Sequence, residues 1–362
     1  MFNKTQAIIT SSTSGTIEDM CLSVLSQIAD GNILKIAFFG KAKDNAEYLQ
    51  NIATLKSIVQ QHYKDNAPLI SYIAQTSHTQ RLIAEITYLT CDNVTIERHR
   101  NFTLLKSDGC AELITGGIIP DDMSANTYEQ ASSIFKGIEK MLNANGFKPS
   151  DIYRQWNYIQ GITMLNDGSQ NYQEFNDARS IFYNTCEWNN GYPAATGIGA
   201  DAGGVTVEVN AIKGASDNFP IDNPLQIAAH SYSQNVLDGK AIEALKEKST
   251  PKFERARLLG KTIFISGTAA IKGEQSAKSH NAVEQTAETM EIMDRLVSKD
   301  NIPAKNKGSR YDLLRVYVKH SKDIEAVKEY MERHYPTVTK HYLIADVCRP
   351  ELLVEIEGIA HI

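Results

Sequence analysis

The feature that most constrains the fold of this chain is an internal repeat. The stretch VTVEVNAIK (205–213) follows the same pattern as LLVEIEGIA (352–360). Before each of them come, in the same order, a glycine-containing strand, a long amphipathic helix, a strand, a second amphipathic helix and a segment that begins YP. Because so many elements recur in one order, we predict two copies of a single α+β unit rather than two unrelated domains.

The repeat divides the chain into predicted domains. The first copy is expected at residues 101–213 and the second copy at residues 256–362. The linker between them, 214–255, is rich in Asp, Asn, Pro and Ser, and a charged helix is predicted near its end at KAIEALKEK. Residues 1–100 also alternate strands and helices, and two interpretations stay open for them: a third, degenerate copy or an unrelated αβ cap.

Composition excludes several classes of partner. The chain has 362 residues, 42% of them hydrophobic, and a net charge of −6 with no long basic run, so we expect no nucleic-acid partner. No apolar run approaches the length of a membrane span, so we expect no membrane partner. The first residues, MFNKTQAIITSST, lack the apolar stretch of a signal peptide, which predicts a cytoplasmic protein.

The sequence also carries no motif for a metal or an organic cofactor. Its five cysteines are scattered without a C-x-x-C pair, and its histidines show no metal-ligand spacing. We find no G-x-G-x-x-G, no phosphate-binding G-K-S/T loop and no G-x-S-x-G elbow. We therefore expect neither a metal nor a cofactor.

The last strand of the second copy carries two carboxylates on one face. Side chains alternate along a strand, so Val354 and Ile356 point one way while Glu355 and Glu357 point the other way. In the first copy, Glu208 stands at the position of Glu355.

Several motifs resemble known families. ISGTAAI, EQTAETMEIM, RVYVKH and CRPELLVEIEGIA are similar to the YjgF/RidA family of enamine-imine deaminases. The tandem arrangement, with PAATGIGA in the first copy and SGTAAI and CRPELLVEIEG in the second, resembles the chorismatases, which remove pyruvate from chorismate. The resemblance implies an α+β fold of tandem YjgF/RidA-like (chorismate-mutase-like) sheet-and-helix domains that bind chorismate where their sheets meet. It also implies that Glu355 and Glu357 face away from the helices, toward the interface between the sheets. It allows either a monomer with a pseudo-trimeric core or a homotrimer.

One departure from the deaminases concerns substrate binding. RidA deaminases carry an arginine in an F-P-A-R segment that grips a substrate carboxylate, whereas Ala195 occupies that place here and the second copy reads YPTVTK. Deaminase chemistry of that type is therefore not expected. Chorismate has two carboxylates, and the nearest cations for them are Arg315, Lys340 and Arg349, of which Lys340 is expected to be the more exposed.

The resemblance places two catalytic candidates near the C-terminus. It carries the chorismatase general acid to Glu355, whose pKa burial would raise; the alternative is a structural carboxylate at the interface. Glu208 is expected to be structural. Cys348 resembles the cysteine of the branch that forms 3-hydroxybenzoate, where the hydrolytic branch tends to have alanine, although a buried cysteine is commonly a small core residue.

The remaining candidates are predicted to contact substrate. Gly267 would let a ligand approach the strand, or would mark a bulge. Thr196 and Gly197 offer a hydroxyl and free amides for a carboxylate, or form a plain turn. Arg315 and Tyr317 should face the interface, where a buried arginine needs a carboxylate from the protein or from the substrate. Tyr183, on the helix before YPAAT, is the last candidate.

Three functions are compatible with these features. The first is a chorismatase that releases pyruvate and 3-hydroxybenzoate. The second is a hydrolytic chorismatase that yields a dihydroxycyclohexadiene carboxylate. The third is a non-catalytic YjgF/RidA-like protein that binds small metabolites, which the presence of Glu355 beside Cys348 disfavours.

Overall fold

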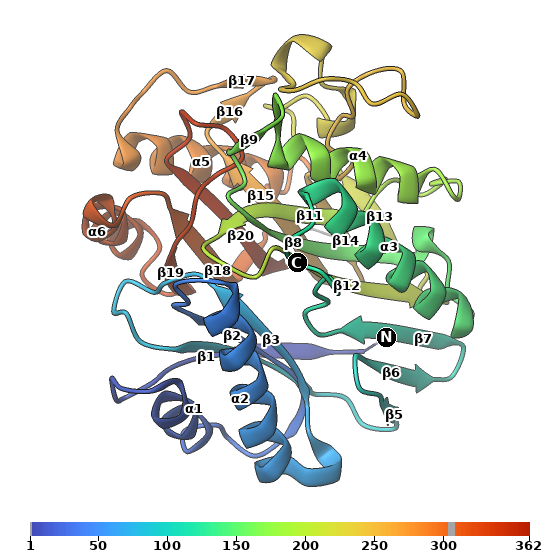
Figure 1. The fold of residues 1–362 in the computed structure, drawn as a ribbon, viewed down its shortest axis with the longest axis vertical. Coiled ribbons are helices and arrows are strands. Elements are labelled where there is room, and N and C mark those ends of the chain that lie inside the picture. The colour runs from blue at the N-terminus through green and yellow to red at the C-terminus, as the bar shows by residue number, and fades with distance from the viewer. Residues whose placement is uncertain (1, 303–307) are drawn as a thin grey trace.

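The computed structural model describes residues 2–302 and 308–362, in which three large sheets are each accompanied by two helices (Figure 1). The N-terminal unit consists of β1 (Lys4–Thr10), α1 (Ile17–Leu25), β2 (Asn32–Gly40), α2 (Asn45–Tyr63), β3 (Leu69–Ala74) and β4 (Ile83–Leu89). The middle unit consists of β5 (Thr95–Arg98), β6 (Phe102–Ser107), β7 (Cys110–Thr115), α3 (Thr127–Ala144), β8 (Ile152–Gln160), α4 (Asn171–Tyr183), β11 (Ala194–Ala200) and β12 (Val205–Lys213), with a small hairpin of β9 (Leu165–Asn166) and β10 (Ser169–Gln170).

The C-terminal unit repeats the same succession of elements. It consists of β13 (Asn218–Ile221), β14 (Ala256–Leu259), β15 (Thr262–Ala269), α5 (Ala282–Leu296), β18 (Arg310–Val318), α6 (Ile324–His334), β19 (Thr339–Ile344) and β20 (Val354–His361), with a small hairpin of β16 (Ile271–Lys272) and β17 (Gln275–Ser276). The α+β fold with tandem sheet-and-helix units, which we predicted from the sequence, is confirmed.

Strand order shows how closely the three units correspond. The middle sheet has the order β11-β8-β12-β7-β6-β5 and the C-terminal sheet has the order β19-β18-β20-β15-β14-β13. The N-terminal sheet, β3-β2-β4-β1, has the same four strands without the outer pair. In each sheet the first two strands are parallel and the others are antiparallel. This shared topology favours a third copy over an unrelated cap for the N-terminal region, while the domain boundaries stay a prediction.

The helices begin where the sequence supplies capping side chains. Thr16, Asp44, Asn126 and Asn281 each accept a hydrogen bond from a backbone N–H in the first turn of α1, α2, α3 and α5. These bonds satisfy donors that have no partner within a helix, and they fix where each helix starts.

Each helix pair covers the outer face of its sheet, and the three inner faces meet in the interior (Figure 1). Val354 and Ile356 of β20 pack in the cluster that contains Met290 and Met293 of α5, as the alternation of side chains predicted. The inner faces share a second kind of cluster, whose members come from all three units: Phe39, Trp156, Tyr158, Tyr317 and Leu343.

The linker differs from the prediction. The segment KAIEALKEK forms turns and not a helix, and the linker instead contains the short 3₁₀ helices Ala229–Ser231 and Gln234–Val236. The reason is that Ile242 and Leu245 are only half-buried there, and a short helix without a buried apolar face is marginal in water. Among the described helices, none combines the length and the apolar character that a bilayer crossing demands.

Candidate active site

A pocket lies where the middle and C-terminal units meet, and the linker forms its third wall. The middle unit contributes residues from α4 and β11, among them Tyr172, Asn176 and Gly197. The C-terminal unit contributes Gly267, Cys348, Arg349 and Glu355. The linker side includes Tyr232, Phe253 and Arg255. Five residues predicted from the sequence therefore line one pocket: Gly197, Gly267, Cys348, Arg349 and Glu355.

Glu355 is a buried carboxyl group in the wall of this pocket. It lies on β20 and is only 4% exposed. Burial raises the pKa of Glu355 to about 8; the negative charge of Glu357 adds to the increase, whereas Arg154 opposes it. At neutral pH the group is therefore mostly protonated.

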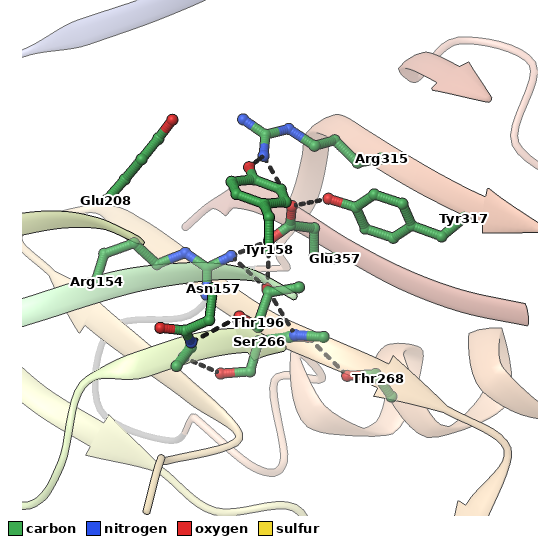
Figure 2. Close-up of polar contacts among 12 residues, drawn as sticks. Arg154, Asn157, Tyr158, Thr196, Glu208, Ser266, Thr268, Arg315, Tyr317 and Glu357 are labelled. Atoms are coloured by element: carbon green, nitrogen blue, oxygen red, sulfur yellow. Dashed lines mark hydrogen bonds and ion pairs between the residues drawn. The ribbon is translucent and has the colours of Figure 1, made fainter. Parts of the chain in front are cut away.

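Glu357, two residues further along the same strand, has the opposite environment (Figure 2). Arg154 from β8 pairs with its Oε2, and Arg315 from β18 donates to its Oε1 at 2.9 Å. The hydroxyl of Tyr317 donates to Oε1 at 2.6 Å, and the hydroxyl of Thr196 donates to Oε2. Burial alone would raise the pKa of Glu357, but these partners lower it below its ordinary value.

The two carboxyls can therefore play different chemical roles. Glu357 stays ionised and fully bonded within the protein, while Glu355 holds a proton next to an open space. A pair of acids whose pKa values are pushed apart is the usual arrangement for separating a proton donor from a fixed anion. A carboxyl with a pKa of about 8 is well matched to general acid catalysis near neutral pH.

Gly267 is what allows the Glu355 carboxyl to lie against β15. A Cβ built on Gly267 would come within 2.0 Å of Glu355 Oε1 and 3.1 Å of Thr196 Cγ2. The Gly267 N–H also donates to Thr196 Oγ1 at 3.1 Å, which ties the two units together here. Both interpretations of Gly267 are borne out: the pairing of β15 with β20 shifts register between Ile265 and Thr268, and the group that approaches the glycine closely is the Glu355 carboxyl itself.

Cys348 lies in the same pocket wall, in the segment before β20. Burial raises the pKa of its thiol to about 12, and the neighbouring Glu355 carboxylate contributes to the increase. The sulfur is consequently a neutral thiol at physiological pH, and not a thiolate.

Two arginines supply positive charge to the pocket. The guanidinium groups of Arg255 and Arg349 each lie 5.5 Å from the ring centre of Tyr232. Arg255 is 4% exposed and donates to the Tyr232 hydroxyl at 2.7 Å, and no carboxylate of the described chain forms an ion pair with it. Arg349 donates to Ser276 Oγ at 3.0 Å and to a backbone carbonyl. A buried guanidinium with no carboxylate partner is suited to an anionic ligand.

Other predicted residues lie outside the pocket lining. The guanidinium of Arg315 donates to Glu85, Tyr158 and Glu357, so the carboxylate partners of this arginine belong to the protein. Tyr317 and Thr196 both donate to Glu357, and Thr196 also accepts a hydrogen bond from the N–H of the pocket residue Gly267.

Two further candidates are more remote. Lys340 donates to two backbone carbonyls and pairs with Glu332, and its side chain is only 3% exposed, so the expected exposure was wrong. The stem of this lysine is covered because its ammonium turns back to the end of α6. The hydroxyl of Tyr183 donates to Gln155 in the core of the middle unit.

Sequence reasoning missed Arg154, Tyr232 and Arg255. Arg154 could have been found from the repeat, since its strand DIYRQWNYIQG holds the same place in the first copy as the strand of Arg315 holds in the second copy. Arg255 immediately precedes the apolar strand β14, which was a weak signal. Tyr232 gave none, because the linker has no periodic pattern.

Comparison with known proteins agrees with this geometry. A family model described as "Chorismatase FkbO/Hyg5-like, N-terminal" matches residues 86–211. A chorismatase from Streptomyces rapamycinicus is 32% identical over 248 residues, which cover 63% of this chain and 69% of that protein. The chain belongs to the chorismatase family.

Two further relatives extend this result. A 3-hydroxybenzoate synthase from Streptomyces hygroscopicus is 31% identical to this chorismatase-family chain over 229 residues, which span 59% of the chain and 64% of the relative. A chorismatase crystal structure superposes with a TM-score of 0.75 at 21% identity and covers 99% of this chain and 98% of its own. The chorismatase fold therefore extends over nearly all of the chain that the structure describes.

Proposed function

We propose that this chorismatase-family enzyme cleaves the enol ether of chorismate and releases pyruvate and 3-hydroxybenzoate. The observation that carries the proposal is Glu355, a protonated carboxyl held at the wall of a pocket that also contains Arg255 and Arg349. An acid and two cations are what the cleavage of a dianionic enol ether requires.

The first step is a proton transfer from Glu355 to the methylene carbon of the enol ether. The transfer converts the enol ether into a cation at the carbon that bears the ether oxygen, and it leaves Glu355 as a carboxylate. That carboxylate then stabilises the neighbouring positive charge until the proton returns. Because Glu357 is already ionised, it cannot supply this proton.

The second step decides the product. If a hydroxyl of the substrate displaces the group within the molecule, chorismate divides into pyruvate and aromatic 3-hydroxybenzoate without consuming water. If water attacks instead, one water is consumed and the second product is a dihydroxycyclohexadiene carboxylate. Cys348 lines the pocket beside Glu355, where its neutral side chain occupies space that water would otherwise take.

Substrate binding falls to the two pocket arginines. We assign the carboxylates of chorismate to Arg255 and Arg349, whose positions beside Tyr232 close the pocket on its linker side. Gly267 and Gly197 keep the two strands free of side chains there. Arg315, Tyr317 and Thr196 act indirectly, by holding Glu357. The cytoplasmic location stays a prediction.

The test is to incubate the purified protein with chorismate, measure pyruvate release and identify the second product by mass spectrometry. We expect pyruvate and 3-hydroxybenzoate in equal amounts. Pyruvate with the diol would show the hydrolytic alternative. Pyruvate no faster than the uncatalysed background would refute cleavage and leave the metabolite-binding alternative.

A further inference from the structure

The shared topology of the three sheets allows their residues to be matched one by one. Lys35 on β2 is paired across the sheet with Thr87, Arg154 on β8 with Asn210, and Arg315 on β18 with Glu357. Lys35, Arg154 and Arg315 are therefore equivalent positions, and all three are buried cations.

The same match applies to the carboxylates. The positions two residues after these cations on β2, β8 and β18 are paired with Glu85 on β4, Glu208 on β12 and Glu355 on β20. Each inner face thus presents one cation and one glutamate at equivalent places. All three glutamates are buried.

At two of the three interfaces, the cation of one unit pairs with the equivalent glutamate of the next. Lys35 of the N-terminal unit lies 2.7 Å from Glu208 of the middle unit. Arg315 of the C-terminal unit donates to both oxygens of Glu85 in the N-terminal unit, at 2.7 and 2.8 Å. If the third interface followed the rule, Arg154 would pair with Glu355.

The third interface breaks the rule, because Arg154 pairs with Glu357 instead (Figure 2). The positions equivalent to Glu357 are Thr87 and Asn210, neither of which carries a charge. At these two matched positions only the C-terminal unit carries two carboxylates, Glu355 and Glu357, and Arg154 pairs with the second of them.

We propose that Glu357 is a positioning residue that holds Arg154 away from the Glu355 carboxyl and so preserves Glu355 as a proton donor. The inference rests on the proposed function, because it explains how the acid of that reaction keeps its proton. It adds a role for a residue that itself does not line the pocket.

A charge count supports the proposal. Lys35, Arg154 and Arg315 are neutralised by Glu85, Glu208 and Glu357, so that Glu355 is a fourth carboxyl beside three cations. An additional negative charge buried without a partner is costly, and the carboxyl remains protonated instead.

The groups that face Glu355 agree with this count. They are Glu357 on its own strand, Arg154 from β8, Tyr172 from α4, and Cys348 with the adjacent Arg349 in the segment before β20. On the linker side of the pocket lie Tyr232, Asp238 and Arg255. Among these, Glu357 and Arg154 are the charges that act on its pKa, in opposite directions.

The decisive experiment is to titrate the Glu355 carboxyl directly in the Glu357→Asn variant, which places at 357 the residue that the middle unit has. The carboxyl would be observed by ¹³C NMR of glutamate-labelled protein without substrate, and assigned by the loss of its signal in Glu355→Gln. Arg154 should turn to Glu355, and the Glu355 pKa should fall by about 1 to 3 pH units, the usual effect of a close arginine. An unchanged pKa would overturn the proposal.

A double variant separates the arginine from the direct effect of the Glu357 charge. In Glu357→Asn with Arg154→Gln, neither charge is left and burial still raises the pKa of Glu355, so this pKa should rise from its value in the single variant back toward the wild-type value. If it stays low, the shift came from lost repulsion by Glu357, and the proposed hold on Arg154 is wrong. The Arg154→Gln variant alone leaves Glu357 with Arg315 and Tyr317, and the pKa of Glu355 should stay raised in it. This variant remains available for measurement if the other two do not fold.

Activity provides a second readout that a purely structural role would not move. In Glu357→Asn the decline of pyruvate release with rising pH should begin at a lower pH than in the wild type, and the double variant should reverse this. Since the NMR titration needs no chorismate, it still tests the role of Glu357 if the protein releases no pyruvate. Failure of the proposed function and failure of this inference are thereby distinguishable.

Discussion

Glu355 and Glu357 are two residues apart on one strand, yet their surroundings move their pKa values in opposite directions. Replacing Glu355 by Gln keeps the shape of the side chain and removes the proton. We expect kcat for pyruvate release to fall by about 10²-fold or more, the usual effect of losing a general acid, with the fold intact. The matched control is Glu208→Gln at the equivalent position, which should leave kcat close to the wild-type value. An equal loss of kcat in this control would contradict the assignment of Glu355 as the general acid.

The pH dependence of the wild type follows from the same residue. A general acid acts in its protonated form, and the pKa of Glu355 is raised to about 8. Activity should therefore persist at neutral pH and be lost as the pH rises through about 8. A pH profile of kcat/KM measures this, and activity that keeps rising well above that pH would exclude Glu355 as the donor.

Cys348 makes a separate prediction about the product. The two fates of the cation need differ by only about 1.4 kcal/mol in barrier for a tenfold change in product ratio. Replacing Cys348 by Ala enlarges the space beside Glu355 and admits water, so the diol should increase relative to 3-hydroxybenzoate while pyruvate release continues. Chromatography of the products gives the ratio, and an unaltered ratio would mean that Cys348 does not control the access of water to the cation.

At the scale of elements, β15 matters because it approaches β20 without a side chain at Gly267. In Gly267→Ala the new methyl would occupy the place of the Glu355 carboxyl, which lies 2.0 Å from the ideal Cβ position. Displacing a catalytic group by this much should lower kcat by about 10²-fold. Gly137→Ala in α3, where nothing lies within 4 Å of the added carbon, is the control and should leave kcat unchanged.

The linker contributes binding rather than chemistry. Arg255 and Tyr232 of the linker are hydrogen-bonded to each other in the wall of the pocket. Arg255→Gln should therefore raise KM for chorismate by about tenfold or more, with a smaller effect on kcat, because a hydrogen bond to a charged group contributes about 1.5–3 kcal/mol. Lys340→Ala, whose ammonium is held near the end of α6, should not alter KM. Steady-state kinetics of both variants decides whether the arginine contacts the substrate.

At the scale of the whole molecule, buried ion pairs join the three sheets. Lys35→Met would leave Glu208 charged and buried without its partner, and should lower the free energy of unfolding by about 3–5 kcal/mol in denaturant titrations. Lys106→Met breaks an exposed ion pair with Glu97 and should change the free energy of unfolding by about 1 kcal/mol or less. Equal effects of the two substitutions would show that the interior pair adds nothing to the assembly of the sheets.

Much of this molecule could be predicted from its sequence, because a repeat and the alternation of side chains are local properties. The tandem units follow from the repeat, and the placement of Val354 and Glu355 on opposite faces of β20 follows from the alternation. The partners of Glu357 do not, since Arg154 and Arg315 come from different sheets and meet only when those sheets dock. The linker could not be predicted either, because it has no periodic pattern that would indicate where its turns fall.

A single polypeptide can alter one of three similar contacts, whereas an assembly of identical subunits must alter all of them together. If every subunit of a symmetric ring carried glutamate at both positions, three cations would face six carboxylates, and the core would hold an excess of negative charge. Here Thr87 and Asn210 occupy the equivalents of Glu357, so the excess carboxyl arises once. Covalent linkage thus lets one contact specialise for proton transfer while the other two keep a neutral interior, and only one working site per chain is expected as a result.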